Sequence, residues 1–333
     1  MTMPSTENPR RTVGSRSAYI QAMRGFAIAA VVLIHCLPES AASIVIRPFL
    51  NWAVAMFLFL SGMLTTEQKV ARGGVIKRRL IKVAAPYLVW SAIYLVALHP
   101  DTSLGVIKAL LTGGASAQMY YLPVYAQLVV LTPLLLKLLK THRVALYAVT
   151  PIMLVAWETF ALLELNVPRL GWLFPMWLLY YLVGLEWGRW RDFLKDRRRL
   201  VAVAAVVGLS SQVAEGFLWN SFGDYGMATS QLRITNMVSS VAVISLFMVG
   251  SEAVKGRLAA CGPLVRLGDL SFGIYLCHMV FVMALSRVVS MAGIACVASS
   301  FAIWAIVLIL SALFVAACQR ILPKRLLSVL GFA

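Results

Sequence analysis

The chain has 333 residues, of which 61% are hydrophobic and only 13% are charged, about half the charged share of an ordinary soluble domain. This composition excludes a soluble protein and predicts an all-α polytopic membrane protein, with most of the chain in the bilayer. A net charge of +17 would point to nucleic acid in a soluble chain, so here it is tested first against membrane topology.

Ten apolar segments are long enough to cross a bilayer, and we expect each of them to be a transmembrane helix. They cover residues 18–37, 44–64, 80–98, 119–139, 144–163, 172–190, 200–218, 232–250, 271–289 and 293–318. The segment 105–112 is too short to cross and is expected to be an interfacial helix. This organisation predicts a disordered basic tail at 1–17, one ten-helix domain at 18–318 and a short basic tail at 319–333.

The positive charges are divided unequally between the two sets of loops. Of the 30 Lys and Arg residues, 24 lie in the tails and loops that ten spans place on one side. Five lie on the other side: Arg47, Lys108, Arg169, Arg233 and Arg287. Because cytoplasmic loops carry an excess of Lys and Arg, this division predicts that both termini are cytoplasmic. It also accounts for the net charge, so we expect no nucleic-acid partner.

Arg24 and His35 lie eleven residues apart in the first apolar segment, AYIQAMRGFAIAAVVLIHCL. Eleven helical steps leave an offset of about 20°, so the two side chains share one helix face, roughly 16 Å apart. Because an Arg in the bilayer is costly, this pairing with a titratable base predicts a site that spans part of the membrane. Alternatively, Arg24 snorkels to lipid phosphates and His35 hydrogen-bonds to a neighbouring helix.

Glu39 follows His35 at position i+4. If the helix continues that far, the carboxylate lies on the same side as the imidazole. A carboxylate in that place would fix the tautomer of His35 and stabilise its protonated form, so the pair is a candidate general base.

A cluster of four basic residues opens the third span, just before Pro86 and Tyr87. Its members are Lys77, Arg78, Arg79 and Lys82. Anchoring of the helix at the cytoplasmic surface explains the cluster. The functional alternative is a cytoplasmic anion site, completed by Arg24, because Arg side chains suit phosphates.

Several outer residues can stack on and hydrogen-bond to a polar acceptor, among them Tyr121, Trp157 and Glu158. Aromatic belts explain the rings without a ligand, but an acid at the edge of a span, such as Glu158, is harder to dismiss. His278 is expected to be a satisfied core histidine, and Ser61-Gly62 a close helix-packing contact. The five Cys residues have no metal-ligand spacing, and no metal is expected.

Five segments, in order along nearly the whole chain, resemble the acyltransferase-3 family of membrane O-acyltransferases. The first span carries an Arg and a His separated by ten residues in MRGFAIAAVVLIH, and the second carries FLFLSGML. The third begins KRRLIKVAAPYLVW, the fourth contains YLPVYAQLVVLTPLLL, and LSFGIYLCH near the C-terminus matches a Ser-x-Gly-Ile-Tyr-x-x-His element.

The resemblance implies transfer of an acyl group from cytoplasmic acyl-CoA, with acetyl-CoA as the expected donor, to a hydroxyl of a cell-surface glycan outside the cytoplasm. The residues implied for acyl-CoA are Arg24, Arg78 and Arg79, for catalysis His35, and for support Ser61, Tyr275 and His278. Lys82 stands where an Arg is common, which weakens a bidentate phosphate role there.

The resemblance also implies a multi-pass protein of a bacterial-type inner membrane. A transporter or flippase of a glycan or lipid-linked precursor is the alternative from another functional class. Direct transfer, an acyl-enzyme route and the oligomeric state are left open at this stage.

Overall fold

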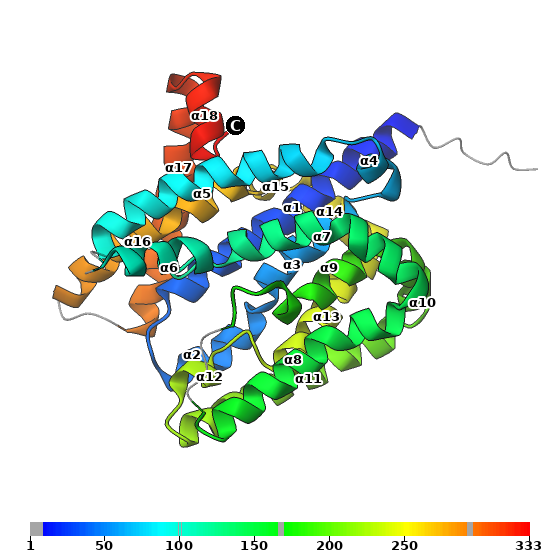
Figure 1. The fold of residues 1–333 in the computed structure, drawn as a ribbon, viewed down its shortest axis with the longest axis horizontal. Helices are drawn as coiled ribbons and strands as arrows, with labels where there is room; N and C mark the ends of the chain where they lie inside the picture. The colour runs from blue at the N-terminus through cyan, green and yellow to red at the C-terminus, as the bar shows by residue number, and fades with distance from the viewer. Residues whose placement is uncertain (1–8, 99, 101, 166–169, 292–295) are drawn as a thin grey trace, which may run out of the picture.

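The computed structural model describes residues 9–98, 100, 102–165, 170–291 and 296–333, and within them the chain is helical, without a β-strand (Figure 1). The all-α prediction is therefore confirmed. In chain order the elements are α1 (Pro9–Cys36), α2 (Ala41–Ile46), the 3-10 helix η1 (Arg47–Phe49), α3 (Trp52–Met63), α4 (Glu67–Ala71), α5 (Val75–Leu98), α6 (Ser103–Thr112), α7 (Tyr121–Thr141), α8 (Arg143–Leu162), η2 (Phe174–Met176), α9 (Leu178–Leu185), α10 (Trp187–Asp196), α11 (Arg198–Ser221), α12 (Tyr225–Ala228), α13 (Ile234–Val249), α14 (Glu252–Ala260), α15 (Gly262–Asp269), α16 (Ser271–Met291), α17 (Val297–Ile321) and α18 (Lys324–Leu330).

Eight helical segments among the described residues are long and apolar enough to cross a membrane. They are formed by α1 from Ala18 onward, α2 together with α3, and α5, α7, α8, α11, α16 and α17. The pair α13 and α14 makes a ninth if it is counted as one span, although the two helices are bent by 88°. The chain is thus a polytopic membrane protein, with a count slightly below the ten spans expected from the sequence.

The expected span at 172–190 differs most from a single helix, because it is divided among η2, α9 and α10. Glu186 separates α9 from α10, and its carboxylate accepts hydrogen bonds from Arg143 and Tyr147 of α8. The eight-residue α9 has six buried residues. Its continuous apolar sequence therefore comes from burial inside the protein, which hydropathy alone cannot distinguish from a lipid-facing span.

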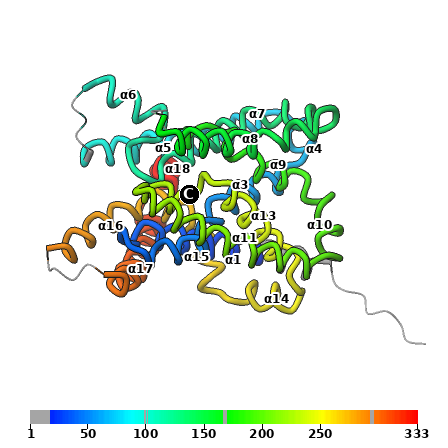
Figure 2. Tube along the Cα trace, turned by 90° about the horizontal axis from the view of Figure 1, so that it is seen from below, coloured from blue at the N-terminus to red at the C-terminus, as the bar shows by residue number. Residues whose placement is uncertain are grey.

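Helix α1 is the central element of the fold and packs against α3, α14, α15, α16 and α17. Figure 2 shows it among helices from all parts of the chain, with α7 and α8 on one side of the molecule and α16 and α17 on the other. Its residues Ala27, Ile28 and Val32 are fully buried, and Trp304 of α17 donates a 2.8 Å hydrogen bond to the carbonyl of Ala29. The face that carries Arg24 and His35 is therefore held by the core of the protein.

The expected packing contact at Ser61-Gly62 is confirmed. Gly62 of α3 lies directly against the backbone of Tyr181 and Gly184 in α9, and Gly184 lies against the carbonyl of Phe59. Two glycines that face each other let the two backbones approach closely, as is typical of helix pairs in membranes.

Helical structure extends into both ranges that the sequence assigns to the tails. Residues 1–8 of the N-terminal tail lie outside the described residues, and α1 begins at Pro9, within the range assigned to that tail. At the other end, α18 folds back onto α5, and Leu327 and Phe332 are buried. Trp90 donates a 3.1 Å hydrogen bond to the carbonyl of Leu330, so apolar burial and this bond make the C-terminal segment part of the core.

Figure 1 shows the start of α1 together with α4 and α10 at the right, and α2 and α12 far from them at the lower left. The loops at α4 and α10 are rich in Lys and Arg, and the charge distribution assigns them to the cytoplasm. The cavity described next lies near α2 and α12, far from these loops.

Candidate active site

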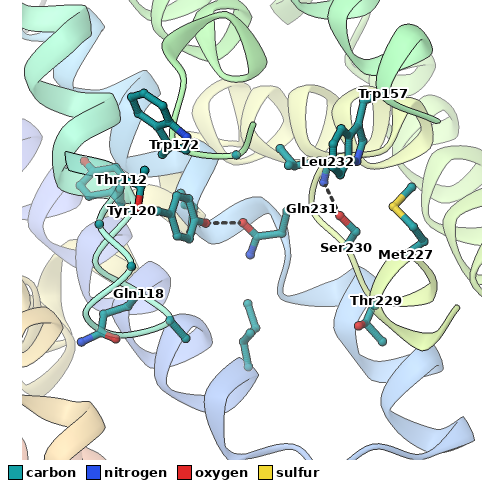
Figure 3. A pocket seen from close by; sticks show the side chains of 18 of the residues that line it. Thr112, Gln118, Tyr120, Trp157, Trp172, Met227, Thr229, Ser230, Gln231 and Leu232 are labelled. Atoms are coloured by element: carbon teal, nitrogen blue, oxygen red, sulfur yellow. Dashed lines mark hydrogen bonds between the residues drawn. The ribbon is translucent and has the colours of Figure 1, made fainter. Parts of the chain in front are cut away.

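A cavity of about 1240 Å³ opens at the end of the molecule that holds α2 and α12. Residues from α1, η1, α6, α7, α8, α12 and α16 line it, together with the segments 113–120 and 229–232. Figure 3 shows Tyr120 and Gln231 joined across part of this space by a hydrogen bond, which is 3.2 Å long, with Trp157 and Trp172 nearby. Aromatic faces and amide groups therefore share one wall.

His35 lies in the last turn of α1, is partly buried and lines this cavity. It also lines a smaller cavity of about 190 Å³, whose wall includes Ser286, Ser299 and Ser300. The helix face that carries Arg24 thus also carries a titratable side chain on a cavity wall.

His278 of α16 lies directly beside His35. The two ring centres are 5.4 Å apart and the ring planes are tilted by 43°. His278 is fully buried, and its Nδ1 lies 3.0 Å and 2.9 Å from the carbonyl oxygens of Ile274 and Tyr275. The core location expected for His278 is confirmed, but its Nε2 has no hydrogen-bond partner among the described residues.

The condition for a helical relation between His35 and Glu39 is not met, because α1 ends at Cys36 and Glu39 is an exposed residue beyond it. Pro38 removes a backbone donor just after the helix, and Ser40 then caps the start of α2. Among the described residues, His35 makes no hydrogen bond to Glu39 or to any other carboxylate. A catalytic role for Glu39 thus loses its geometric basis.

Arg47 is the charged neighbour of His35 that the sequence analysis did not select. It lines the same cavity, and its Nη2 donates a 3.1 Å hydrogen bond to the carbonyl of Ile34. Its Nε is buried without a partner among the described residues. The signal for this role in the sequence is an Arg inside the second apolar segment, 44–64.

Arg24 of α1 and Arg79 of α5 both lie near Tyr125 of α7, and neither lines the cavity that His35 lines. The positive charges of both residues act on the Tyr125 hydroxyl, which lies near Ser61 of α3. Arg79 in addition donates a 2.6 Å hydrogen bond to the hydroxyl of Thr65. Helices α1, α3, α5 and α7 thus contribute to one polar cluster.

The other two basic residues assigned to acyl-CoA, Arg78 and Lys82, are exposed on α5. Since neighbours i and i+1 on a helix point in different directions, only Arg79 of the Arg78-Arg79 pair can face the cluster around Tyr125. Arg78 and Lys82 lie at the surface, where they are accessible to a large anionic ligand and to lipid phosphates alike.

A row of aromatic rings connects the Tyr125 cluster with His35. Ring centres are 6.2 Å apart between Tyr125 and Tyr121, and 5.5 Å apart between Tyr121 and Tyr275. They are 6.3 Å apart between Tyr275 and His278, the immediate neighbour of His35. Tyr121 and Tyr275 also line the cavity. The polar cluster and the cavity are therefore joined by continuous aromatic packing.

Two of the three residues expected to bind the acceptor, Tyr121 and Trp157, line the cavity. Glu158 instead accepts a hydrogen bond from the backbone N–H of Ile234 and lies beside Arg233 and Glu215. Arg233 is fully buried, and its Nη1 lies 3.6 Å from Glu215. Burial lowers the pKa of the Arg233 guanidinium, whereas the two carboxylates act in the opposite direction. Glu158 thus belongs to a group of charged residues around the buried Arg233, and it does not line the cavity.

Comparison with known proteins identifies the family. A family model described as an acyltransferase domain, Acyl_transf_3, matches residues 17–320. No curated protein and no solved structure gives a significant match. The family match covers nearly the whole chain, including every described membrane-spanning segment except the last residue of α17. The chain belongs to the acyltransferase-3 family, and it is an acyltransferase with several membrane-spanning helices.

Proposed function

We propose that this protein transfers an acyl group, an acetyl group being expected, from cytoplasmic acyl-CoA to a hydroxyl of an extracytoplasmic glycan. In this proposal the protein lies in a bacterial-type inner membrane with both termini in the cytoplasm. The relation between Arg24 and His35 is the observation that carries the proposal. One helix presents a cation toward the basic end of the molecule and, roughly 16 Å further along its axis, a titratable base at a cavity.

The donor would bind through the Tyr125 cluster. Arg24 and Arg79 supply the positive charge for CoA phosphates, and exposed Arg78 and Lys82 extend that charge to the surface. The pantetheine arm would then run past Tyr121 toward His35, along the aromatic row. The extended arm suits the separation between Arg24 and His35, because the thioester must reach the base while the phosphates stay near the cytoplasm.

The acceptor would enter the cavity from outside. Rings such as Trp157, Trp172 and Tyr120 offer flat faces for a sugar ring, and Gln231 offers an amide for its hydroxyls. A cavity with both features supports a sugar acceptor over a purely apolar one. Glu158 would act indirectly in this proposal, by holding the backbone of Ile234 next to the cavity segment 229–232.

The chemical step would be a direct transfer. His35 takes the proton of the acceptor hydroxyl while that oxygen attacks the thioester carbon. The carbon–sulfur bond breaks, and the CoA thiolate receives the proton from His35, so no proton is gained or lost overall. Arg47 would stabilise the negative charge that develops on the thioester oxygen, because its guanidinium lies at the same cavity wall.

The test is thioester turnover by the purified protein. Acetyl-CoA is supplied with a mixture of sugars, and free thiol and acetylated sugar are measured together. The proposal expects both products in equal amounts from the wild type, and both formed at least about 100-fold more slowly by His35→Ala. Absence of acetylated sugar, with thiol release equal in the two proteins, contradicts it. Mass spectrometry of surface glycans from wild-type and deletion cells would then identify the natural acceptor.

A further inference from the structure

The tautomer of His278 is determined by its surroundings. Its Nδ1 lies within hydrogen-bond distance of the carbonyl oxygens of Ile274 and Tyr275, at 3.0 Å and 2.9 Å. Carbonyl oxygens only accept hydrogen bonds, so Nδ1 must carry the proton. In a neutral imidazole the other nitrogen, Nε2, then has a free lone pair and acts as an acceptor.

This acceptor is buried and unused. His278 is fully buried, and its Nε2 has no hydrogen-bond partner in the part of the chain that the structure describes. A buried acceptor without a donor costs roughly 1–3 kcal/mol, so a donor at that place is favoured. The ring of His35 is the neighbouring group that can supply an N–H. The ring centres are 5.4 Å apart and the rings are in contact without a hydrogen bond, and this distance allows one N–H···N bond once a ring N–H of His35 turns toward Nε2.

We infer that His278 is the positioning residue of His35: its Nε2 accepts a hydrogen bond from one ring N–H of His35 and leaves the other ring nitrogen of His35 free as a base at the cavity. The inference rests on the proposed function, in which His35 takes the acceptor proton. It assigns to His278 the orienting role that the sequence analysis gave to Glu39.

The groups around His35 agree with this assignment. Arg47 from η1 brings a positive charge and cannot accept a hydrogen bond. Tyr275 donates its hydroxyl proton to the carbonyl of Gln118. The Tyr225 hydroxyl accepts from the Ser40 backbone N–H and donates to the carbonyl of Pro38. Neither hydroxyl is therefore directed at His35. Among the described residues, His278 is thus the acceptor that faces His35 from a neighbouring helix.

A neutral orienting group has a physical advantage at this depth. A carboxylate inside the membrane would have to be desolvated, at a cost that the single nearby Arg47 would need to offset. An imidazole that is fixed by two helix carbonyls orients His35 without adding a charge. It can also accept from the imidazolium that forms when His35 takes a proton.

Two variants separate positioning from packing. His278→Asn keeps an amide N–H near the carbonyls of Ile274 and Tyr275, but its side chain is too short to reach His35. His278→Gln places an amide oxygen near the position of Nε2 and can accept from His35. The control is His142→Asn, because His142 is exposed and contacts Thr141 at the α7–α8 connection.

The first readout needs no activity. The chain has four His residues, so nitrogen-15 labelling of histidine gives few ring signals, and substitution assigns them. We expect the ring-nitrogen shifts of His35 to change in His278→Asn, to move back toward the wild type in His278→Gln, and to stay the same in His142→Asn. His35 signals that are identical in the wild type and His278→Asn would overturn the inference.

The second readout is turnover of acetyl-CoA with mixed sugars. Loss of a group that orients a histidine typically lowers activity by about 10- to 100-fold in metal sites, and a similar fall in kcat is expected for His278→Asn. KM for acetyl-CoA should stay within about twofold, and His278→Gln should recover part of kcat. Equal losses in Asn and Gln, with altered unfolding temperature in both, would assign His278 to packing alone. If His35→Ala stays active, the proposed function itself fails, which is a different outcome.

Discussion

The guanidinium of Arg79 donates a 2.6 Å hydrogen bond to the hydroxyl of Thr65, and so connects the first turns of α5 to the end of α3. This bond turns Arg79 toward Tyr125 and Arg24, while Arg78 points to the surface. Adjacent residues in one basic cluster therefore have different environments, and the proposed donor site predicts different consequences for their loss.

Arg24→Ala and Arg79→Ala should each weaken acetyl-CoA binding by about tenfold or more, because a hydrogen bond to a charged group contributes roughly 1.5–3 kcal/mol. Arg78→Ala should have a smaller effect, since Arg78 is exposed and the pairing of an exposed charge is weak. Calorimetric titration of each purified variant with acetyl-CoA measures the affinities. Unchanged affinity in both Arg24→Ala and an Arg78/Arg79 double variant would refute the donor assignment.

His35→Ala should lower the rate of acyl transfer by about 10²- to 10⁴-fold, the usual contribution of a general base. The protein should remain folded, because His35 lies on a cavity wall, where a smaller side chain does not disturb the packed face of α1. Thiol release reports activity, and size-exclusion chromatography with thermal unfolding reports folding. A monodisperse His35→Ala protein with wild-type turnover would exclude the general-base role.

Arg47→Gln should lower kcat by about 10²- to 10³-fold if its guanidinium stabilises the developing oxyanion, the range found when one such donor is removed. Gln retains an N–H that can bond to the carbonyl of Ile34, so the end of α1 keeps a partner. Arg47→Lys retains the charge and should be more active than Arg47→Gln. If all loss of activity in Arg47→Gln parallels a loss of folded protein, Arg47 only stabilises the end of α1.

Features that depend on one helix could be predicted from the sequence, whereas contacts between distant helices could not. The shared face of Arg24 and His35 and the close packing at Gly62 follow from helix geometry and residue size, and both could be predicted. The pairing of His35 with His278 joins residues from the first and the ninth expected spans, so no spacing in the sequence encodes it. The i+4 relation between His35 and Glu39 needs a continuous helix, and α1 ends at Cys36. The difference at Glu39 therefore concerns where one helix ends, whereas the difference at His278 concerns how separate helices pack.

Gly184→Ala should destabilise the protein by about 1–3 kcal/mol, the usual cost of overpacking, because a Cβ at Gly184 would overlap the carbonyl oxygen of Phe59. The backbone cannot move away easily, since Gly62 of α3 is packed just as closely on α9. Gly188→Ala is the matched control: it lies in α10, and nothing is within 4 Å of an added Cβ. Thermal unfolding in detergent measures both, and equal stability of the two variants would contradict the proposed close packing.

The final prediction concerns the side of the membrane from which each substrate enters. Arg24 and Arg79 both lie near Tyr125, toward the basic loops of the molecule. His35 faces a cavity at the other end. A donor held at the first place and an acceptor held at the second can meet only near His35. Sealed inside-out vesicles present the cytoplasmic face to the bath, so they separate the two entrances.

In such vesicles acetyl-CoA added to the bath should be used, and free CoA should appear in the bath. A membrane-impermeant sugar acceptor should react only when it is trapped inside the vesicles. Detergent permeabilisation is the control, because it should make the two acceptor placements equivalent. Equal reaction of the impermeant sugar added on the bath side of sealed vesicles would rule out transfer across the bilayer. His35 could still be the base in that case, but donor and acceptor would then have to share the cytoplasmic entrance, and the cavity lined by Trp157 and Arg47 would need another explanation.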